Sequence, residues 1–209
     1  MARTKPFDDF LEEYEQWFAQ NHFTYLSELE AVKQFIPDWK KGIEIGIGSG
    51  RFALPLNITE GIEPSNRMLN FCCGKGLKVV YGIAEQLPIP DSTYEFALMV
   101  TTICFVDDVL KSFQEVKRIL KQGGTFIIGL VDKNSPLGIA YQRMKENNKF
   151  YRLATFYSTD EIINYLKECQ FRDFKIVQTV FGDLKDINQV QRFKPGHGEG
   201  GFVVKKAVT

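Results

Sequence analysis

The sequence lacks an excess of charge of either sign. Its 209 residues include 26 basic and 26 acidic side chains, so the formal net charge at pH 7 is zero. Proteins that bind nucleic acid or an anionic membrane surface usually present a basic patch, and this composition does not indicate one. We therefore expect a small or neutral partner and no binding to nucleic acid.

Long apolar runs are also missing. No stretch approaches the roughly 20 apolar residues of a membrane-spanning helix. The first ten residues, MARTKPFDDF, do not contain the apolar segment of a signal peptide. These two absences predict a cytoplasmic protein that makes no membrane contact.

Cysteine and histidine are scarce. The four cysteines form no CxxC pair and have no histidine close by in the sequence; they are Cys72, Cys73, Cys104 and Cys169. This pattern indicates neither a disulfide framework nor a zinc site. We expect reduced thiols and no bound metal.

Short apolar runs that read as buried strands alternate with helical signals along most of the chain. The runs span residues 43–47, 58–62, 77–81, 95–101, 125–131, 171–180 and 201–207. Such alternation is typical of an α/β fold, a three-layer sandwich in which helices cover both faces of a parallel sheet. The last two runs have no helix between them, so the final strand of this mostly parallel seven-stranded sheet should be antiparallel.

The N-terminal segment before this alternation is helical in pattern. Apolar residues recur at helical spacing between Phe7 and Phe35, which predicts two amphipathic helices, the second with Thr24 as its N-cap. We expect an N-terminal helical cap over residues 1–40 and one larger domain over residues 41–209.

A glycine-rich turn follows the first predicted strand, in the sequence GIEIGIGSGRF at residues 42–52. Gly46, Gly48 and Gly50 lie between that strand and a helix predicted to begin near Arg51. Open α/β sheets bind ligands at the carboxyl ends of their strands. Glycine permits both the backbone angles of a tight turn and the close approach of a ligand, so this turn predicts a binding site.

An acid at the end of the second strand suggests what the ligand is. Glu63 lies seventeen positions after Gly46, where a carboxylate can accept hydrogen bonds from both hydroxyls of a ribose. The ligand is therefore expected to be a nucleoside. The dinucleotide pattern GxGxxG would require glycine at position 51, where this chain has Arg51, so a nucleotide-dependent oxidoreductase is the less favoured alternative.

The spacing E-x-G-x-G-x-G, from Glu44 to Gly50, resembles the first motif of class I S-adenosylmethionine-dependent methyltransferases. Three later segments resemble successive motifs of the UbiE-like branch, which methylates small molecules: GIEPSNRML at 61–69, AEQLPIPDSTYEFALM at 84–99 and SFQEVKRILKQGGTFIIG at 112–129. The resemblance implies a Rossmann-like fold, S-adenosylmethionine as cofactor and methyl transfer to a small-molecule acceptor. A methyltransferase-like protein that binds the cofactor without catalysis is the second alternative.

The resemblance also assigns roles to residues. The three glycines would lie beside the methionine part of the cofactor with Glu44 near it, Glu63 would hold the ribose, and Met68 and the backbone of Ala84 would contact the adenine. The full implied set of cofactor-binding residues is Glu44, Gly46, Gly48, Gly50, Glu63, Pro64, Met68, Ala84, Glu85 and Thr101. The chain departs from the family pattern in three places: Ile83 replaces an acid, Cys104–Phe105 replaces His-Trp, and Gln122 replaces proline.

No pair of residues in the sequence identifies a general base. His197 and Glu199 are candidates because the loop KPGHGEGGF follows a strand whose end should lie on the ligand side, and Tyr14 is a third candidate. A base is required only if the acceptor arrives protonated.

The acceptor itself should be a small metabolite. Methyltransferases of nucleobase or amide nitrogens usually carry an Asn/Asp-Pro-Pro-aromatic turn after the fourth strand, and this chain reads TTICF there. We expect a lid over the acceptor made by three segments: the first helix with Tyr14 and Trp17, the stretch with Tyr141 and Tyr151, and the GHGEGGF loop. The protein should be a monomer or a homodimer.

Overall fold

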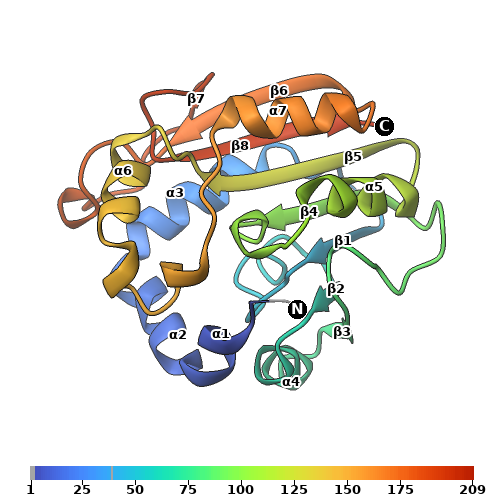
Figure 1. Ribbon diagram of the computed structural model, residues 1–209, viewed down its shortest axis with the longest axis horizontal. Helices are drawn as coiled ribbons and strands as arrows, with labels where there is room; N and C mark the ends of the chain where they lie inside the picture. The colour runs from blue at the N-terminus through green and yellow to red at the C-terminus, as the bar shows by residue number, and fades with distance from the viewer. Residues whose placement is uncertain (1–2, 39) are drawn as a thin grey trace.

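The computed structural model describes residues 3–38 and 40–209, and this part of the chain forms one twisted sheet flanked by helices (Figure 1). The order of the strands across the sheet is β3-β2-β1-β4-β5-β8-β6-β7. Their bounds are β1 Gly42–Ile45, β2 Glu60–Glu63, β3 Lys78–Tyr81, β4 Tyr94–Val100, β5 Leu120–Val131, β6 Arg172–Thr179, β7 Lys194–Pro195 and β8 Phe202–Val208.

The pairing confirms a mostly parallel sheet. Strands β1 to β5 pair in parallel, and β8 lies antiparallel between β5 and β6. The described chain has eight strands rather than the predicted seven, because the two residues of β7 pair with Val177 and Gln178 at the edge of the sheet. Pro195 is acceptable in β7, since a residue without an N–H is tolerated on an edge strand.

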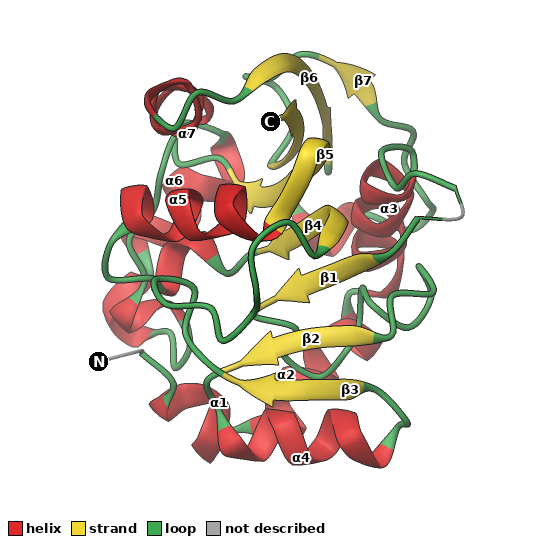
Figure 2. Cartoon of the chain, turned by 90° about the vertical axis from the view of Figure 1, so that its right-hand side faces the viewer, coloured by secondary structure: helices red, strands yellow, loops and turns green. Residues whose placement is uncertain are grey.

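Helices cover both faces of the sheet, as the three-layer prediction requires (Figure 2). Helices α5 and α7 pack on one face and α3 packs on the other. The bounds are α1 Lys5–Asp9, α2 Leu11–Gln20, α3 His22–Lys33, α4 Asn66–Gly74, α5 Val109–Ile119, α6 Pro136–Arg143 and α7 Thr159–Glu168. None of the helices within residues 3–38 and 40–209 has both the length and the apolar character that crossing a membrane requires.

The central strand β4 shows why continuous apolar runs predicted this sheet correctly. Ala97 and Met99 belong to the apolar core beneath α5, whereas Phe96, Leu98 and Val100 belong to the core beneath α3. A strand buried on both faces cannot alternate between polar and apolar residues.

The N-terminal segment contains three helices where two were predicted, and Thr24 is not an N-cap. The breaks fall at Phe10 and at Asn21, which precedes the first residue of α3. The amide group of Asn21 donates to the Trp17 carbonyl at 3.0 Å, a local hydrogen bond that competes with helix continuation. Thr24 lies inside α3, buried, and its hydroxyl has no hydrogen-bond partner among the described residues.

The helix predicted to begin near Arg51 is also absent, because residues 51–57 form a series of turns. Its start is helix-like, since the Leu54 N–H donates to the Gly50 carbonyl at 3.1 Å. Pro55 has no N–H to continue this pattern. Asn57 then takes a left-handed backbone conformation, with φ of 57°, and ends the segment.

Helix α3 is part of the main core, whereas α1 and α2 lie further out. Leu29, Ala31 and Val32 of α3 share an apolar cluster with Ile127 of β5 and Phe202 of β8. The division into a cap of residues 1–40 and a domain of residues 41–209 stays a prediction. The packing shows that the last of the three N-terminal helices cannot be removed without exposing this core.

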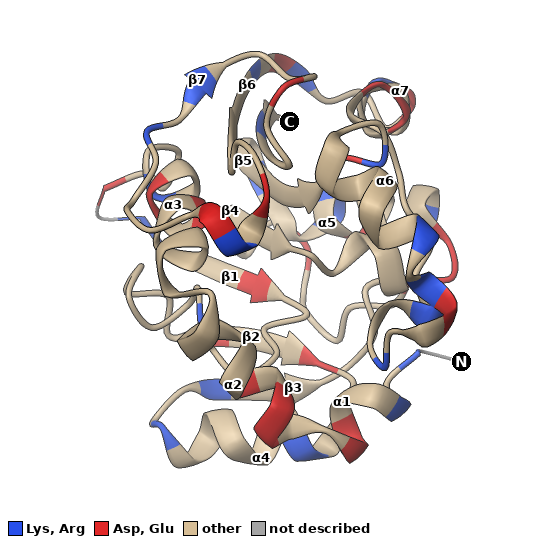
Figure 3. Ribbon diagram, turned by 90° about the vertical axis from the view of Figure 1, so that its left-hand side faces the viewer, with Lys and Arg blue, Asp and Glu red and all other residues tan. Residues whose placement is uncertain are grey.

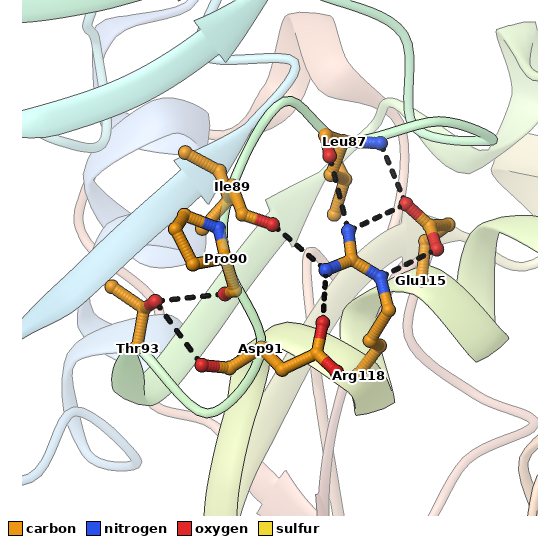
Figure 4. A network of polar contacts seen from close by, with 7 residues as sticks. All are labelled: Leu87, Ile89, Pro90, Asp91, Thr93, Glu115 and Arg118. Carbon is orange, nitrogen blue, oxygen red and sulfur yellow. Dashed lines mark hydrogen bonds and ion pairs between the residues drawn. The ribbon is translucent and has the colours of Figure 1, made fainter.

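The loop between β3 and β4 is fastened to α5 by Arg118 (Figure 4). Its guanidinium donates to the carbonyls of Leu87 at 3.0 Å and Ile89 at 2.8 Å, and it pairs with Asp91 at 2.6 Å. Glu115 accepts from Arg118 and from the Leu87 N–H, each at 2.8 Å. This network fixes the loop whose first residues, at 83–85, reach the functional site described below.

We predict that Arg118→Ala lowers the free energy of unfolding by about 1 to 3 kcal/mol, because two backbone carbonyls and two carboxylates lose a donor. Urea denaturation would measure this change. Gln114→Ala is the matched control, since Gln114 is exposed on the same helix. Equal unfolding midpoints for the two variants would contradict the role assigned to Arg118.

Candidate active site

A cavity of about 290 Å³ lies at the carboxyl ends of the parallel strands. Helices α1, α2, α3 and α6 gather on this side of the molecule (Figures 1 and 3). The floor is formed by the residues that end β1, β2 and β4, including Gly46, Gly48, Glu63, Thr101 and Thr102. The roof is mostly aromatic and comes from two distant segments: Phe7, Tyr14, Trp17 and Phe18, and Tyr141, Phe150 and Tyr151.

The three glycines of the turn after β1 all have a left-handed backbone, with φ of 69° at Gly46, 56° at Gly48 and 80° at Gly50. Side chains also close in on them. A Cβ at Gly46 would overlap Thr102, one at Gly50 would lie 2.7 Å from the Leu77 Cδ1, and one at Gly48 would lie 3.3 Å from the Tyr14 hydroxyl. Glycine is therefore required by backbone conformation and by packing, and Gly48 is the position that faces the roof of the cavity.

Glu63 joins this turn to the end of β2. Its carboxylate accepts from the Gly48 N–H at 2.8 Å and from the Ser65 N–H at 2.9 Å, and it lines the cavity. Burial raises the pKa of Glu63 to about 7. A carboxylate oxygen has two acceptor positions, so each oxygen of Glu63 keeps one for a further donor such as a ribose hydroxyl.

The remaining predicted cofactor residues divide into two groups. Pro64, Glu85 and Thr101 line the cavity together with Gly46, Gly48 and Glu63, whereas Glu44, Gly50, Met68 and Ala84 do not. Ala84 was expected to contact the adenine, but the neighbouring Ile83 lines the cavity instead.

Two of the residues outside the cavity have clear positions. Met68 is completely buried, with its N–H bonded to the Ser65 hydroxyl at 3.2 Å. Glu44 is buried on the opposite face of β1 from Ile43 and Ile45, and its Oε2 has no hydrogen-bond partner among the described residues. Burial raises the pKa of Glu44 well above its ordinary value.

Tyr14 is the one catalytic candidate that the structure places at the cavity. Its ring packs edge-on against Phe18, with centroids 5.1 Å apart, and against Phe150 at 6.0 Å. Burial, followed by the charges of Glu44 and Glu63, raises the pKa of Tyr14 above its ordinary value. The phenol therefore stays protonated near neutral pH and can donate a hydrogen bond, but it is a poor general base.

His197 and Glu199 do not line this cavity, and their role at the acceptor stays a prediction. The His197 Nε2 is 3.8 Å from Asp160 of α7, and Glu199 pairs with Lys194 at 3.2 Å. The N–H groups of Glu199 and Gly200 donate to the Gln178 side chain at 2.8 and 2.7 Å, which holds the loop against β6. Leu184, from the segment just after β6, lines the cavity instead.

Polar contacts fix α1 and α2 to the floor of the site. The carboxylate of Glu15 accepts from the Ser49 hydroxyl inside the glycine turn and from Arg51 at 2.6 Å. At the start of α4, the Ser65 hydroxyl donates to Asp8 at 2.6 Å. The first two helices therefore dock directly on the turn and on the residues after β2.

Aromatic contacts then close the roof between the two distant segments. Phe7 lies 4.9 Å from Phe105 and 5.8 Å from Phe150 between ring centroids, and Tyr141 lies 4.8 Å from Tyr151. Two of the three predicted lid segments thus meet over the cavity. Phe7 and Phe150 belong to this roof although the sequence analysis gave them no role at the site.

Cys104, one of the departures from the family pattern, is buried beside the cavity. Its thiol donates to the Thr101 carbonyl at 3.1 Å. Burial raises the pKa of Cys104 to about 12, so the thiol is protonated at neutral pH. The neighbouring Phe105 is the residue that reaches the cavity wall.

Comparison with known proteins identifies the family. Residues 43–128 match the family described as a methyltransferase domain. A crystal structure from Thermotoga maritima, described as an S-adenosylmethionine-dependent methyltransferase and a possible histamine N-methyltransferase, has 46% sequence identity and a TM-score of 0.96, over 98% of this chain and 99% of that chain. The chain belongs to the S-adenosylmethionine-dependent methyltransferases.

Two further proteins match nearly the whole chain, one in sequence and one in fold. An uncharacterized protein of Methanocaldococcus jannaschii is 42% identical over 201 residues, which is 96% of this chain and 97% of that protein. An S-adenosylmethionine-dependent methyltransferase from Archaeoglobus fulgidus shares the fold, with a TM-score of 0.71 at 16% identity over 96% of this chain and 100% of that chain. The methyltransferase is thus an enzyme with S-adenosylmethionine as its cofactor, and the oxidoreductase alternative no longer applies.

The site fits that cofactor. The glycine turn leaves backbone rather than side chains facing the cavity, and Glu63 retains acceptor positions for ribose hydroxyls. Both features lie on the same wall, next to Ile83 and Glu85.

We predict that Gly48→Ala weakens binding of S-adenosylhomocysteine on the order of tenfold, because the new methyl group strains the turn and presses on the Tyr14 hydroxyl. Titration calorimetry would measure the affinity. Gly76→Ala is the matched control: Gly76 has φ of 84°, but a Cβ there would meet nothing within 4 Å. Similar losses of affinity in both variants would show that backbone strain alone explains the result.

Proposed function

We propose that this methyltransferase transfers the methyl group to a small-molecule acceptor and belongs to the UbiE-like branch. The observation that carries the proposal is the closed aromatic roof over the cavity. Side chains of α1, α2 and the 141–151 segment meet above the strand ends, so the space beneath them suits a small molecule. The balanced charge of the chain agrees, because nucleic-acid-binding domains usually carry an excess of basic residues.

In this proposal the cofactor lies along the floor. The backbone of Gly46 and Gly48 would meet its methionine part, Glu63 would accept from its ribose, and Ile83 and Glu85 would border its adenine. Bound S-adenosylmethionine supplies an electrophilic methyl carbon on a positively charged sulfur. Gly50 would contribute by holding the turn in shape, and direct contacts from Glu44, Met68 and Ala84 stay predictions.

The residues of the roof would orient the acceptor and exclude water. Methyl transfer is an in-line displacement, so alignment of the attacking atom and a dry site supply most of the catalysis. Tyr14 would donate a hydrogen bond from its protonated phenol, and Phe105 and Tyr151, which are stacked with centroids 6.3 Å apart, would form an apolar wall. A monomeric or homodimeric state and a cytoplasmic location also stay predictions.

A labelling experiment tests the class of acceptor. The enzyme would be incubated with methyl-labelled S-adenosylmethionine and, separately, with a small-molecule extract, transfer RNA and a protein extract. We expect label only in the small-molecule pool, on a species heavier by one methyl group. His197→Ala is the control variant, since His197 lies outside the cavity, and it should label the same species.

Label in the RNA or protein pool would contradict the small-molecule proposal. Transfer to none of the pools, with S-adenosylhomocysteine still bound, would favour the non-catalytic alternative. Loss of labelling in His197→Ala would support the role first predicted for that residue.

A further inference from the structure

Glu28 of α3 is an acidic residue inside the aromatic cavity that the proposed function does not use. The side chain lines the cavity, and the residue is only 5% exposed. No hydrogen bond or ion pair to its carboxylate is found within residues 3–38 and 40–209, and burial raises the pKa of Glu28 to about 8. A carboxylate in such surroundings is costly to keep charged, and an unpaired one calls for an explanation.

The other charged side chains that line the cavity, among the described residues, all have partners. Arg3 donates to the Leu153 carbonyl at 2.6 Å, Glu63 accepts from two backbone N–H groups, and Glu85 accepts from the Asp107 N–H at 2.6 Å. Glu28 alone among them has none. The cavity therefore contains one acidic side chain whose oxygens are free to receive a ligand.

Glu28 lies at the opposite end of the cavity from the residues proposed to hold the cofactor. Helix α3 packs against β6 and β8, and the cavity residues from that side of the sheet are Val131, which ends β5, and Leu184, which follows β6. In contrast, Glu63 ends β2 and Ile83 follows β3 at the other side. A group bound to Glu28 would thus lie on the acceptor side, beyond the glycine turn.

Aromatic rings surround this end of the cavity. Tyr141 and Tyr151 both line it, with their centroids 4.8 Å apart. Burial, with the charge of Glu28 as the second cause, raises the pKa of Tyr141, and the same charge contributes to the raised pKa of Tyr151. Both rings therefore lie within electrostatic range of the carboxylate. An acidic side chain and aromatic rings in the same cavity together favour a cationic ligand.

We propose that Glu28 binds a positively charged nitrogen of the methyl acceptor, so that the acceptor is a small amine with an apolar or aromatic body. This inference rests on the proposed function, since it specifies the acceptor of the same cavity. An ammonium group supplies the N–H donors that Glu28 lacks, and its positive charge favours the ionised form of the buried carboxyl. The rings of Tyr141 and Tyr151 would add cation–π attraction, and the apolar wall would hold the rest of the molecule.

The test uses the full chain and three phenylalkylamines that differ only in the length of the alkyl chain. Benzylamine, 2-phenylethylamine and 3-phenylpropylamine would be titrated into the enzyme saturated with S-adenosylhomocysteine, alongside the alcohols of equal length. We expect the best amine to bind about tenfold more tightly than its alcohol, the size of a charge-assisted hydrogen bond. Glu28→Gln should remove this preference while its affinity for S-adenosylhomocysteine stays that of the parent.

Glu30→Gln is the matched control, because Glu30 is exposed on the same helix and should keep the preference for amines. Glu28→Gln should fold, since it replaces a buried acid with a neutral group of the same shape, and thermal unfolding would verify this. If the parent binds S-adenosylhomocysteine but prefers no amine over its alcohol, or if Glu28→Gln keeps the preference, the inference about Glu28 is wrong and the proposed function stands. If the parent does not bind S-adenosylhomocysteine, the proposed function fails and this inference fails with it.

Discussion

The hydrogen bond from the Gly48 N–H to Glu63 is the contact on which the rest of the site depends. It joins the left-handed turn after β1 to the end of β2 and so sets the floor of the cavity. Neighbouring residues of the same two segments, Ser49 and Ser65, bond to Glu15 and Asp8 and thereby place α1 and α2 above that floor. The turn after β1 and the end of β2 therefore form the floor of the cavity and also hold the two helices that contribute to its roof.

Much of the fold could be predicted from the sequence because burial on both faces of a central strand leaves a direct mark on its composition. In the two central strands β4 and β5, residues 96–100 and 126–131 contain no charged side chain, and the parallel order follows from the helices between the strands. The exact residues at which helices begin and end were harder to predict. Thr24 is a typical N-cap residue, yet the helix boundary lies three residues earlier, at Asn21. Pro55 prevents a helix after Arg51 that the apolar pattern alone would allow.

The residues of the candidate site also fall into those that the sequence predicts and those that it does not. Gly46, Gly48 and Glu63 could be found because the sequence places the glycines in a turn after the first strand and Glu63 at the end of the second. The position of His197 could not be found, because it depends on the edge strand β7 and on Gln178 holding the loop, and neither has a clear signal in the sequence. Glu28 escaped notice for a different reason. An acid on a helix is usually solvated, and the burial of this one depends on how α3 packs against β6 and β8, which the sequence does not show.

A crystal structure of the complex with S-adenosylhomocysteine tests the central claim most directly. The account predicts that the ribose hydroxyls bond to the Glu63 carboxylate and that the amino-acid part follows the backbone of Gly46 and Gly48. The sulfur should then face the part of the cavity roofed by Tyr14 and Tyr151, with Glu28 beyond it. A product molecule bound with its ribose away from Glu63, or bound outside this cavity, would contradict the account.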